Sequence, residues 1–194
     1  MSGEQTSNNC TTADREKRRV ALSSLAAATV LTVLKLIVGL ATNSLGILSE
    51  AAHSALDLVA AGITYWTVRI SGQPADREHT YGHGKFENLS ALAQTLLLLV
   101  TCVWILYEAG SRLLFGHHEP VIASAPAFAV ILLSIAVDYS RSRALKKTAD
   151  KYNSQALEAD ALHFSTDIWS SCVVLLGLFA VLVDIAGQTL DRAE

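Results

Sequence analysis

Five long apolar runs, separated by short polar segments, set the pattern of this chain. A helix rises 1.5 Å per residue, so about 20 mainly apolar residues cross a hydrocarbon core about 30 Å thick. The pattern therefore predicts an all-α fold, a multi-pass transmembrane helical bundle. The predicted spans are about 20–41, 45–70, 86–114, 123–143 and 156–186.

Polar segments are expected at both ends of this transmembrane domain, which covers 20–186. Residues 1–19 form a polar tail, expected to be disordered, that ends in the basic cluster Arg15, Lys17, Arg18 and Arg19. This polar start lacks the apolar run of a secretory signal. Residues 187–194 are expected to connect onward from the fifth span. Lysine and arginine concentrate in the tail and in the loops after the second and fourth spans, which predicts a cytoplasmic N-terminus.

Composition supports the membrane interpretation. Hydrophobic residues make up 51% of the chain, charged residues only 17%, and the mean hydropathy is +0.35. Soluble domains carry about 25% charged residues.

Cys10, Cys102 and Cys172 lack CxxC spacing, so we interpret them as small buried hydrophobes. The segment GHGK lacks the spacing of a phosphate-binding loop, and no GxSxG elbow is present.

The stretch SEAAHSALDL in the second span carries the first candidate site. His53 and Asp57 are four residues apart and share one face of a helix. The fifth span repeats the pattern with His163 and Asp167. Ionisable residues inside a membrane span are functional candidates because burying them in lipid is unfavourable.

Depth tests whether the two pairs can meet. His53 and Asp57 lie roughly 12 and 18 Å from the outer end of the second span, and His163 and Asp167 lie at similar depths from the inner end of the fifth. In a core about 30 Å thick, all four fall near the midplane. The two pairs can therefore face each other across a bundle.

Two imidazoles and two carboxylates suit a tetrahedral Zn²⁺ ion, and Co²⁺, Ni²⁺ and Cd²⁺ are chemical neighbours. A closed site of four protein ligands argues against hydrolysis, which needs an open position for water. Metal binding requires neutral histidine and ionised aspartate, so protons compete with the metal. The alternative is that these residues only form helix–helix hydrogen bonds.

The loop after the second span offers a second candidate metal site. Asp76, His79 and His83 are spaced so that one helical turn or a tight loop gathers all three, and ordinary solvated polar residues are the alternative. His117 and His118 are more typical of a solvated exterior loop.

Four further polar residues have less specific predicted roles. Asp160 shares nearly the same face as His163, which favours a second-shell or pathway role. Lys35 is expected to snorkel outward or to pair with Glu50 or Asp138. Asp138 and Asp184 lie near predicted span ends, so an interfacial position is expected.

The motifs HSALD and ALHFSTD, with QPADREHTYGHGKFENLSALAQ between them, closely resemble those of cation diffusion facilitators. The resemblance covers about residues 15 to 185. That family consists of divalent-metal/proton antiporters that handle mainly zinc and act as homodimers. The resemblance implies a transport site at His53, Asp57, His163 and Asp167, and a cytoplasmic loop site at Asp76, His79 and His83.

The resemblance also implies six spans followed by a cytoplasmic metal-binding domain. This sequence stops before a sixth span, and QTLDRAE is similar to the connection leading into it. His-Asp on both helices is mostly found in zinc carriers of the family, whereas Asp or Asn in place of the first His is found more often in carriers of iron or manganese.

These observations predict a plasma-membrane carrier that exports Zn²⁺ from the cytoplasm in exchange for protons. Cd²⁺, Co²⁺, Ni²⁺, Fe²⁺ and Mn²⁺ are alternative substrates, and neither an organic cofactor nor a nucleic-acid partner is indicated. One rival is a metal-binding or sensor subunit of a hetero-oligomer that does not transport. Another is an intramembrane metalloenzyme, although neither span histidine belongs to an HExxH motif.

Overall fold

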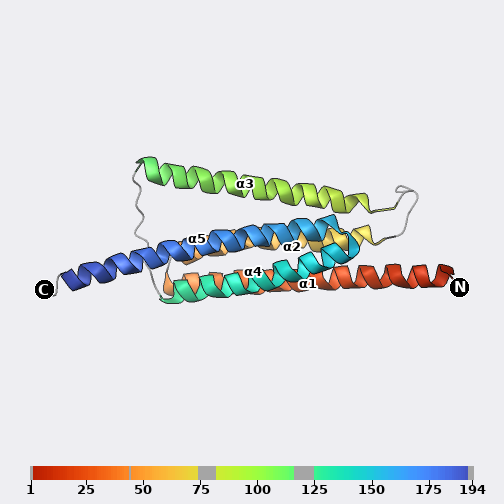
Figure 1. Ribbon diagram of the computed structural model, residues 1–194, viewed down its shortest axis with the longest axis horizontal. Coiled ribbons are helices and arrows are strands. Elements are labelled where there is room, and N and C mark those ends of the chain that lie inside the picture. Colours follow the sequence, from red (N-terminus) through yellow and green to blue (C-terminus); the bar gives the residue numbers. More distant parts are fainter. Residues whose placement is uncertain (1, 44, 74–81, 116–124, 192–194) are drawn as a thin grey trace.

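The computed structural model describes residues 2–43, 45–73, 82–115 and 125–191, and within them the chain is helical without strands. The predicted all-α bundle is confirmed. Its elements, in chain order, are α1 (Ser2–Thr42), α2 (Leu45–Ser71), α3 (Lys85–Phe115), α4 (Ala125–Tyr152) and α5 (Gln155–Asp191) (Figure 1).

Three helices extend beyond the predicted spans. α1 begins at Ser2, so the tail expected to be disordered is helical. Contacts with α4 account for the part nearest the bundle, because Glu16 accepts hydrogen bonds from Lys151 Nζ at 2.7 Å and from the Tyr152 hydroxyl at 2.5 Å. α4 continues to Tyr152 rather than ending near residue 143, and α5 continues to Asp191 through most of the expected connection.

Asparagine residues make the two tight turns of the described chain. Asn43, between α1 and α2, and Asn153, between α4 and α5, both have a φ of 49°. Asparagine tolerates this left-handed conformation better than most residues, and it commonly ends helices. The second turn is closed by a hydrogen bond from the Ser154 amide to the Ala149 carbonyl at 3.1 Å. These turns fold α2 back on α1 and α5 back on α4.

α1, α2, α4 and α5 form the main bundle, and α3 lies to one side against α5 and α2 (Figure 1). Small side chains dominate the buried core, which allows the helices to approach closely in place of large-residue packing. The core cluster consists of Ala21, Ala28, Ala61, Val68, Leu145, Ala149, Ala156, Leu157, Ala161 and Phe164.

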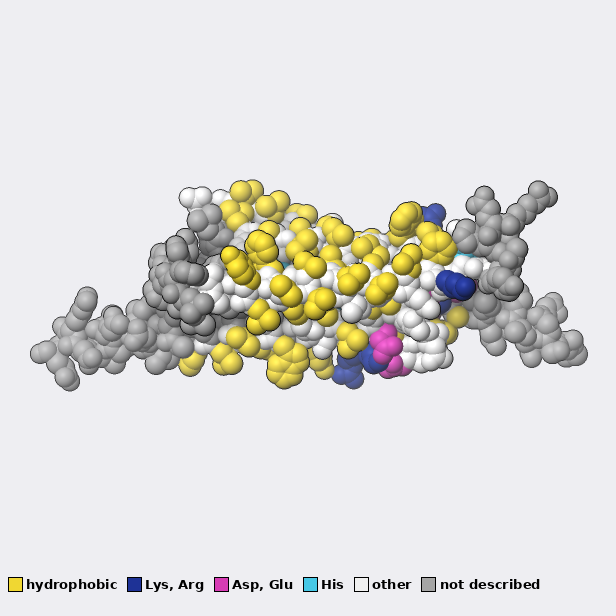
Figure 2. All heavy atoms as spheres, turned by 90° about the horizontal axis from the view of Figure 1, so that it is seen from above, with side chains coloured by type: hydrophobic (Ala, Val, Ile, Leu, Met, Phe, Trp, Pro, Cys, Tyr) yellow, Lys and Arg dark blue, Asp and Glu magenta, His cyan; other side chains and the backbone are white. Residues whose placement is uncertain are grey.

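Large hydrophobic side chains face outward. Figure 2 shows them covering the middle of one face, with charged side chains gathered toward the end of the molecule nearer the N-terminus. By length and composition, the helical segments 12–41 and 85–107 are apolar enough to cross a membrane, with mean hydropathies of 2.0 and 2.2. Only 28% and 11% of their most apolar windows are buried, so most of this apolar surface lies on the outside.

Glu87 joins four helices at the end of the bundle where α2 ends and α3 begins. Its Oε1 accepts hydrogen bonds from Lys17 Nζ of α1 and from the Ser71 hydroxyl of α2, both at 3.0 Å. Its Oε2 accepts from the Ser154 hydroxyl, just before α5, at 2.6 Å. We call Glu87, Lys17, Ser71 and Ser154 the Glu87 cluster. This cluster fixes the helix ends that border the loop after α2.

Candidate metal centre

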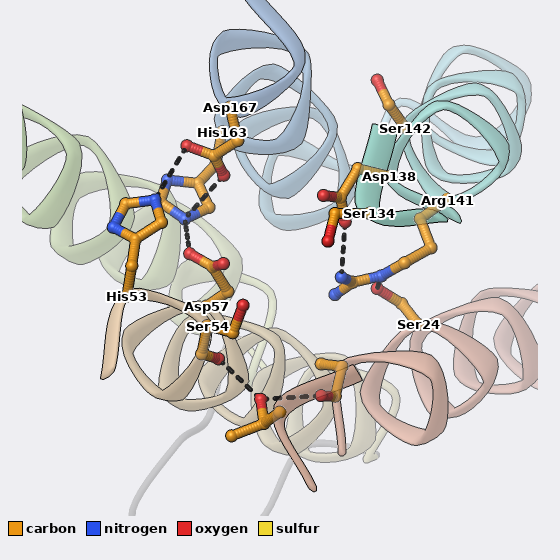
Figure 3. Close-up of polar contacts among 12 residues, drawn as sticks. Ser24, His53, Ser54, Asp57, Ser134, Asp138, Arg141, Ser142, His163 and Asp167 are labelled. Atoms are coloured by element: carbon orange, nitrogen blue, oxygen red, sulfur yellow. Dashed lines mark hydrogen bonds and ion pairs between the residues drawn. The ribbon is translucent and has the colours of Figure 1, made fainter. Parts of the chain in front are cut away.

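His53 and Asp57 of α2 lie opposite His163 and Asp167 of α5 (Figure 3). His163 Nε2 is 3.2 Å from Asp57 Oδ1 and 3.5 Å from Asp167 Oδ2. His53 Nε2 is 3.7 Å from Asp167 Oδ1. Each histidine therefore faces an aspartate of the other helix, and we call these four residues the midplane cluster.

Helix geometry explains why the four side chains converge. In each helix the histidine and aspartate are four residues apart, so both project from one face. Small neighbours, including Ala60, Ala61 and Ala161, are almost fully buried between the helices. They leave room for imidazole and carboxylate groups to meet at the interface.

Burial differs among the four residues. Asp57, His163 and Asp167 are buried, with 8%, 2% and 9% of their surface exposed, whereas the His53 side chain retains 31%. His53 therefore forms the accessible edge of the midplane cluster.

The spacing of the ligand atoms fits a small tetrahedral ion. One ligand atom from each of His53, Asp57 and Asp167 lies within 4.8 Å of the other two. His163 is outside that group, but its Nε2 forms a hydrogen bond with Asp57 Oδ1 at 3.2 Å and lies 3.5 Å from Asp167 Oδ2. Bonds of 2.0–2.1 Å, typical of zinc with nitrogen and oxygen, place tetrahedral ligands about 3.3 Å apart. The observed nitrogen–oxygen separations lie close to that value.

A buried lysine flanks the midplane cluster without joining it. Lys35 Nζ donates to the Ser54 hydroxyl at 2.7 Å and pairs with Glu50 Oε2 at 3.2 Å. Of the expected roles for Lys35, the pairing with Glu50 is confirmed. The Thr32 hydroxyl bonds the Ser54 carbonyl at 2.9 Å, so these contacts attach α1 to the turn of α2 that carries His53.

Asp138 is buried among the helices, with 8% of its surface exposed, and its position at the membrane interface stays a prediction. Arg141 Nη1 donates to Asp138 Oδ1 at 3.1 Å and Arg141 Nε donates to the Ser24 hydroxyl at 3.2 Å (Figure 3). The guanidinium also lies 3.6 Å from the ring centre of Phe164, the neighbour of His163. Hydropathy does not predict this pair, because the pairing depends on how the side chains are turned within the bundle.

The loop candidates are only partly described. Asp76 and His79 lie outside the described residues, as do His117 and His118. His83 is buried, with 6% of its surface exposed, and its ring stacks on that of Phe86 at 5.7 Å. The proposed loop site therefore remains a prediction from the sequence.

Asp160 and two of the cysteines have side chains that the structure describes. Asp160 is fully buried, and neither carboxylate oxygen has a hydrogen-bond partner among the described residues. Cys102 and Cys172 are free thiols of intermediate exposure, so the expectation that they are buried was wrong.

Comparison with known proteins identifies the family. The model of the cation efflux transmembrane domain matches residues 21–192. The chain belongs to the cation efflux family. It is therefore the helical membrane domain of a family of metal cation transporters, as the resemblance in the sequence implied.

Curated relatives include proteins of bacteria and plants. A cation-efflux pump FieF of Shewanella oneidensis is 34% identical over 178 residues, covering 83% of this chain and 58% of its own length. Metal tolerance protein 2 of rice, Oryza sativa, is 32% identical, covering 82% of this chain and 47% of its own. Metal tolerance protein C1 of Arabidopsis thaliana is 34% identical, with coverages of 76% and 34%. The chain spans about half the length of the curated relatives it matches.

Proposed function

We propose that this chain carries out divalent metal efflux, most specifically the exchange of cytoplasmic Zn²⁺ for protons. The observation that supports the proposal best is the convergence of His53, Asp57, His163 and Asp167 from two helices. Family membership supports metal cations as the substrate class. The choice of zinc is based on the two imidazoles, which favour zinc and its chemical neighbours over ions that prefer oxygen ligands.

Charge balance explains how such a site binds and releases its substrate. Asp57 and Asp167 contribute two negative charges, which one divalent cation neutralises inside the bundle. Protons compete for the same four groups, because a protonated imidazole or carboxyl cannot bind a metal ion. Zinc therefore binds where protons are scarce and is released where protons replace it. Ion sites near the midplane serve carriers of the alternating-access type in the same way.

The proposal includes a direction and an assembly. The basic residues near the N-terminus and in the loops after the second and fourth spans favour a cytoplasmic N-terminus and an inner or plasma membrane location. Asp76, His79 and His83 are then a cytoplasmic loop site near the start of α3. We also propose a homodimer, which the resemblance in the sequence implies.

Reconstituted vesicles provide the test. Asp57→Ala removes one carboxylate of the midplane cluster and is expected to abolish zinc flux driven by a proton gradient. Asp150→Ala is the matched control, because Asp150 is an exposed carboxylate on α4 whose side chain is 60% accessible. Wild-type flux in Asp57→Ala would contradict the site assignment. Zinc binding by the unaltered chain without any flux would favour the sensor or partner-subunit alternative.

A further inference from the structure

A second group of polar residues is buried between α2, α3 and α5, between the midplane cluster and the loop after α2. Thr64, Gln94 and Asp160 are exposed by 0%, 2% and 0%. Thr64 is seven residues beyond Asp57, roughly 10 Å by helical rise, and Asp160 is three residues before His163, roughly 4.5 Å. Both displacements point toward the same end of the bundle, because α2 and α5 are antiparallel.

The hydrogen bonds in this group use up its donors. Gln94 Nε2 donates to the Thr64 hydroxyl at 2.9 Å and to the Ser90 hydroxyl at 3.1 Å. The Thr64 hydroxyl donates in turn to the Ala60 carbonyl at 3.2 Å. Thr64 approaches the Asp160 carboxylate as a hydrogen-bonding neighbour. The geometry of this contact is too poor for a well-formed hydrogen bond, because the Thr64 hydroxyl hydrogen is directed to the Ala60 carbonyl. The group therefore presents acceptors rather than donors.

Three buried oxygen atoms have no hydrogen-bond partner within the described part of the chain. They are Gln94 Oε1 and both carboxylate oxygens of Asp160. Leaving a buried acceptor unpaired costs about 1–3 kcal/mol, and more when the group is charged. A carboxylate and an amide oxygen near one hydroxyl therefore require a positively charged or proton-donating species to compensate them.

Arg141 does not supply that compensation fully. It is the strongest cationic neighbour of Asp160, yet its hydrogen bonds go to Asp138 and Ser24, and its Nη2 is also unpaired among the described residues. Asp138 and Asp160 carry two negative charges against the single charge of Arg141. Arg141 alone therefore does not neutralise both carboxylates.

An open groove borders the group at Gln94, although neither Thr64 nor Asp160 lines it. It measures about 320 Å³, lies between α3 and α5, and Gln94 is among the residues that line it. Gln155 and Glu158, from the first turn of α5, line it as well. Oxygen-bearing side chains thus extend from the helix ends near the loop to Gln94 and, through Thr64, to Asp160.

We propose that Asp160 and Gln94, with Thr64 between them, form a second cation site made of oxygen ligands. A partly hydrated divalent cation occupies it between the loop and the midplane cluster. Carboxylate, amide and hydroxyl oxygens suit hard divalent cations, which retain some water ligands. This inference rests on the proposed function, because a transit site has a purpose only in a chain that moves the ion onward.

Manganese is the probe for the test, because Mn²⁺ prefers oxygen ligands and its electron paramagnetic resonance signal reports binding. The background protein carries Asp57→Asn, Asp167→Asn and Asp76→Asn, which removes the carboxylates of both other candidate sites. We expect this chain, in lipid nanodiscs, to bind one Mn²⁺ ion saturably. Adding Asp160→Asn should weaken that binding at least about tenfold, since affinity follows the number of charged ligands. Asp150→Asn, the matched exposed control, should leave it unchanged.

Gln94 distinguishes ligation from a structural role. In the chain without other substitutions, Gln94→Glu adds a carboxylate to the proposed site and should tighten Mn²⁺ binding, whereas Gln94→Leu should weaken it. If Gln94 has only a structural role, both substitutions should weaken Mn²⁺ binding. Absence of bound Mn²⁺ in the background protein, or binding that survives Asp160→Asn, would overturn the proposal and assign the three oxygens to water or to a protonated Asp160.

Zinc measurements separate this inference from the proposed function. Asp160→Asn should slow zinc flux several-fold while the midplane zinc affinity stays within a factor of about three, because no midplane ligand is removed. An unchanged flux rate would count against the transit site alone. Full zinc binding by Asp57→Asn would instead count against the midplane site, whatever the result of the Mn²⁺ binding measurements.

Discussion

The Glu87 cluster and the midplane cluster contain similar buried carboxylates, but their oxygens are paired to different degrees. Glu87 accepts three hydrogen bonds at 2.6–3.0 Å, one of them from the ammonium group of Lys17. Asp57 and Asp167 face only histidines, at 3.2–3.7 Å, and no lysine or arginine pairs with either within the described residues. Asp167 Oδ2 has no hydrogen-bond partner there.

This difference separates a structural cluster from one arranged for an ion. Buried polar groups in a folded protein are normally paired, and an exception needs a specific reason. The Glu87 cluster is complete without any further species and links α1, the end of α2, the start of α3 and the turn before α5. In the midplane cluster, His163 Nε2 and Asp57 Oδ1 form a hydrogen bond at 3.2 Å, and Asp167 Oδ2 has no partner among the described residues, an arrangement that the proposed cation would complete. Metal affinity should therefore depend on the midplane cluster, and the free energy of unfolding on the Glu87 cluster.

The largest effect is expected for zinc affinity in Asp57→Asn. This substitution keeps the side-chain shape but removes a charged ligand, so affinity at the midplane should fall by more than about 100-fold, beyond the loss typical of outer-shell changes. Isothermal titration of the chain with zinc measures it. Asp150→Asn should bind zinc normally. An affinity in Asp57→Asn within about threefold of the unaltered chain would contradict the assignment.

Zinc should stabilise the fold through the midplane cluster. A ligand that binds only the folded state at 100 times its dissociation constant raises the free energy of unfolding by about 2.7 kcal/mol. Denaturant unfolding in mild detergent, with and without zinc, measures the increase. Asp57→Asn should lose most of the increase while unfolding normally without zinc. Equal stabilisation of both proteins would place the bound zinc elsewhere.

Glu87→Gln should show the opposite behaviour. The neutral amide loses the charged interaction with Lys17 and weakens three hydrogen bonds, so the free energy of unfolding should fall by about 2 kcal/mol. Zinc affinity should not change. Glu158→Gln is the matched control, because this exposed carboxylate pairs with Lys146 at 2.7 Å and such surface pairs contribute less than about 1 kcal/mol. A large loss of zinc affinity in Glu87→Gln would break the proposed division between the clusters.

A smaller change is expected in metal preference for His53→Asp. Replacing an imidazole by a carboxylate makes the ligand set harder, which favours Mn²⁺ and Fe²⁺ over Zn²⁺. We expect the affinity ratio to shift by about tenfold, equivalent to about 1.4 kcal/mol. Competition titrations with zinc and manganese measure the ratio. Lys35→Met is the control and should not shift the affinity ratio, because Lys35 pairs outside the cluster. An unchanged zinc-to-manganese affinity ratio in His53→Asp would exclude His53 as a ligand.

Sequence reasoning predicted the helices and the paired motifs because both depend on local periodicity. Apolar runs located the five helices, and the four-residue spacing put each histidine and aspartate on one helix face. The equal depths of the two pairs then followed from helical rise alone. The convergence of His53, Asp57, His163 and Asp167 in the structure is what these local rules anticipated.

The partners of single polar residues were harder to predict, because they depend on the rotation of each helix about its axis. Asp138 lay near a predicted span end, yet it turns inward to Arg141. Glu87 lies beside the predicted start of the third span, but its three partners come from α1, from α2 and from the turn before α5. The helical tail was missed because contacts such as Glu16 with Lys151 involve residues far apart in sequence.

X-ray absorption at the zinc edge tests the central claim most directly. The sample is the chain with His79→Ala and His83→Ala, which removes the imidazoles of the proposed loop site, loaded with one equivalent of zinc. The account predicts four-coordinate zinc with two imidazole nitrogens and two carboxylate oxygens at about 2.0–2.2 Å. Zinc surrounded by six oxygens, or zinc without imidazole scattering, would contradict a site formed by His53, Asp57, His163 and Asp167.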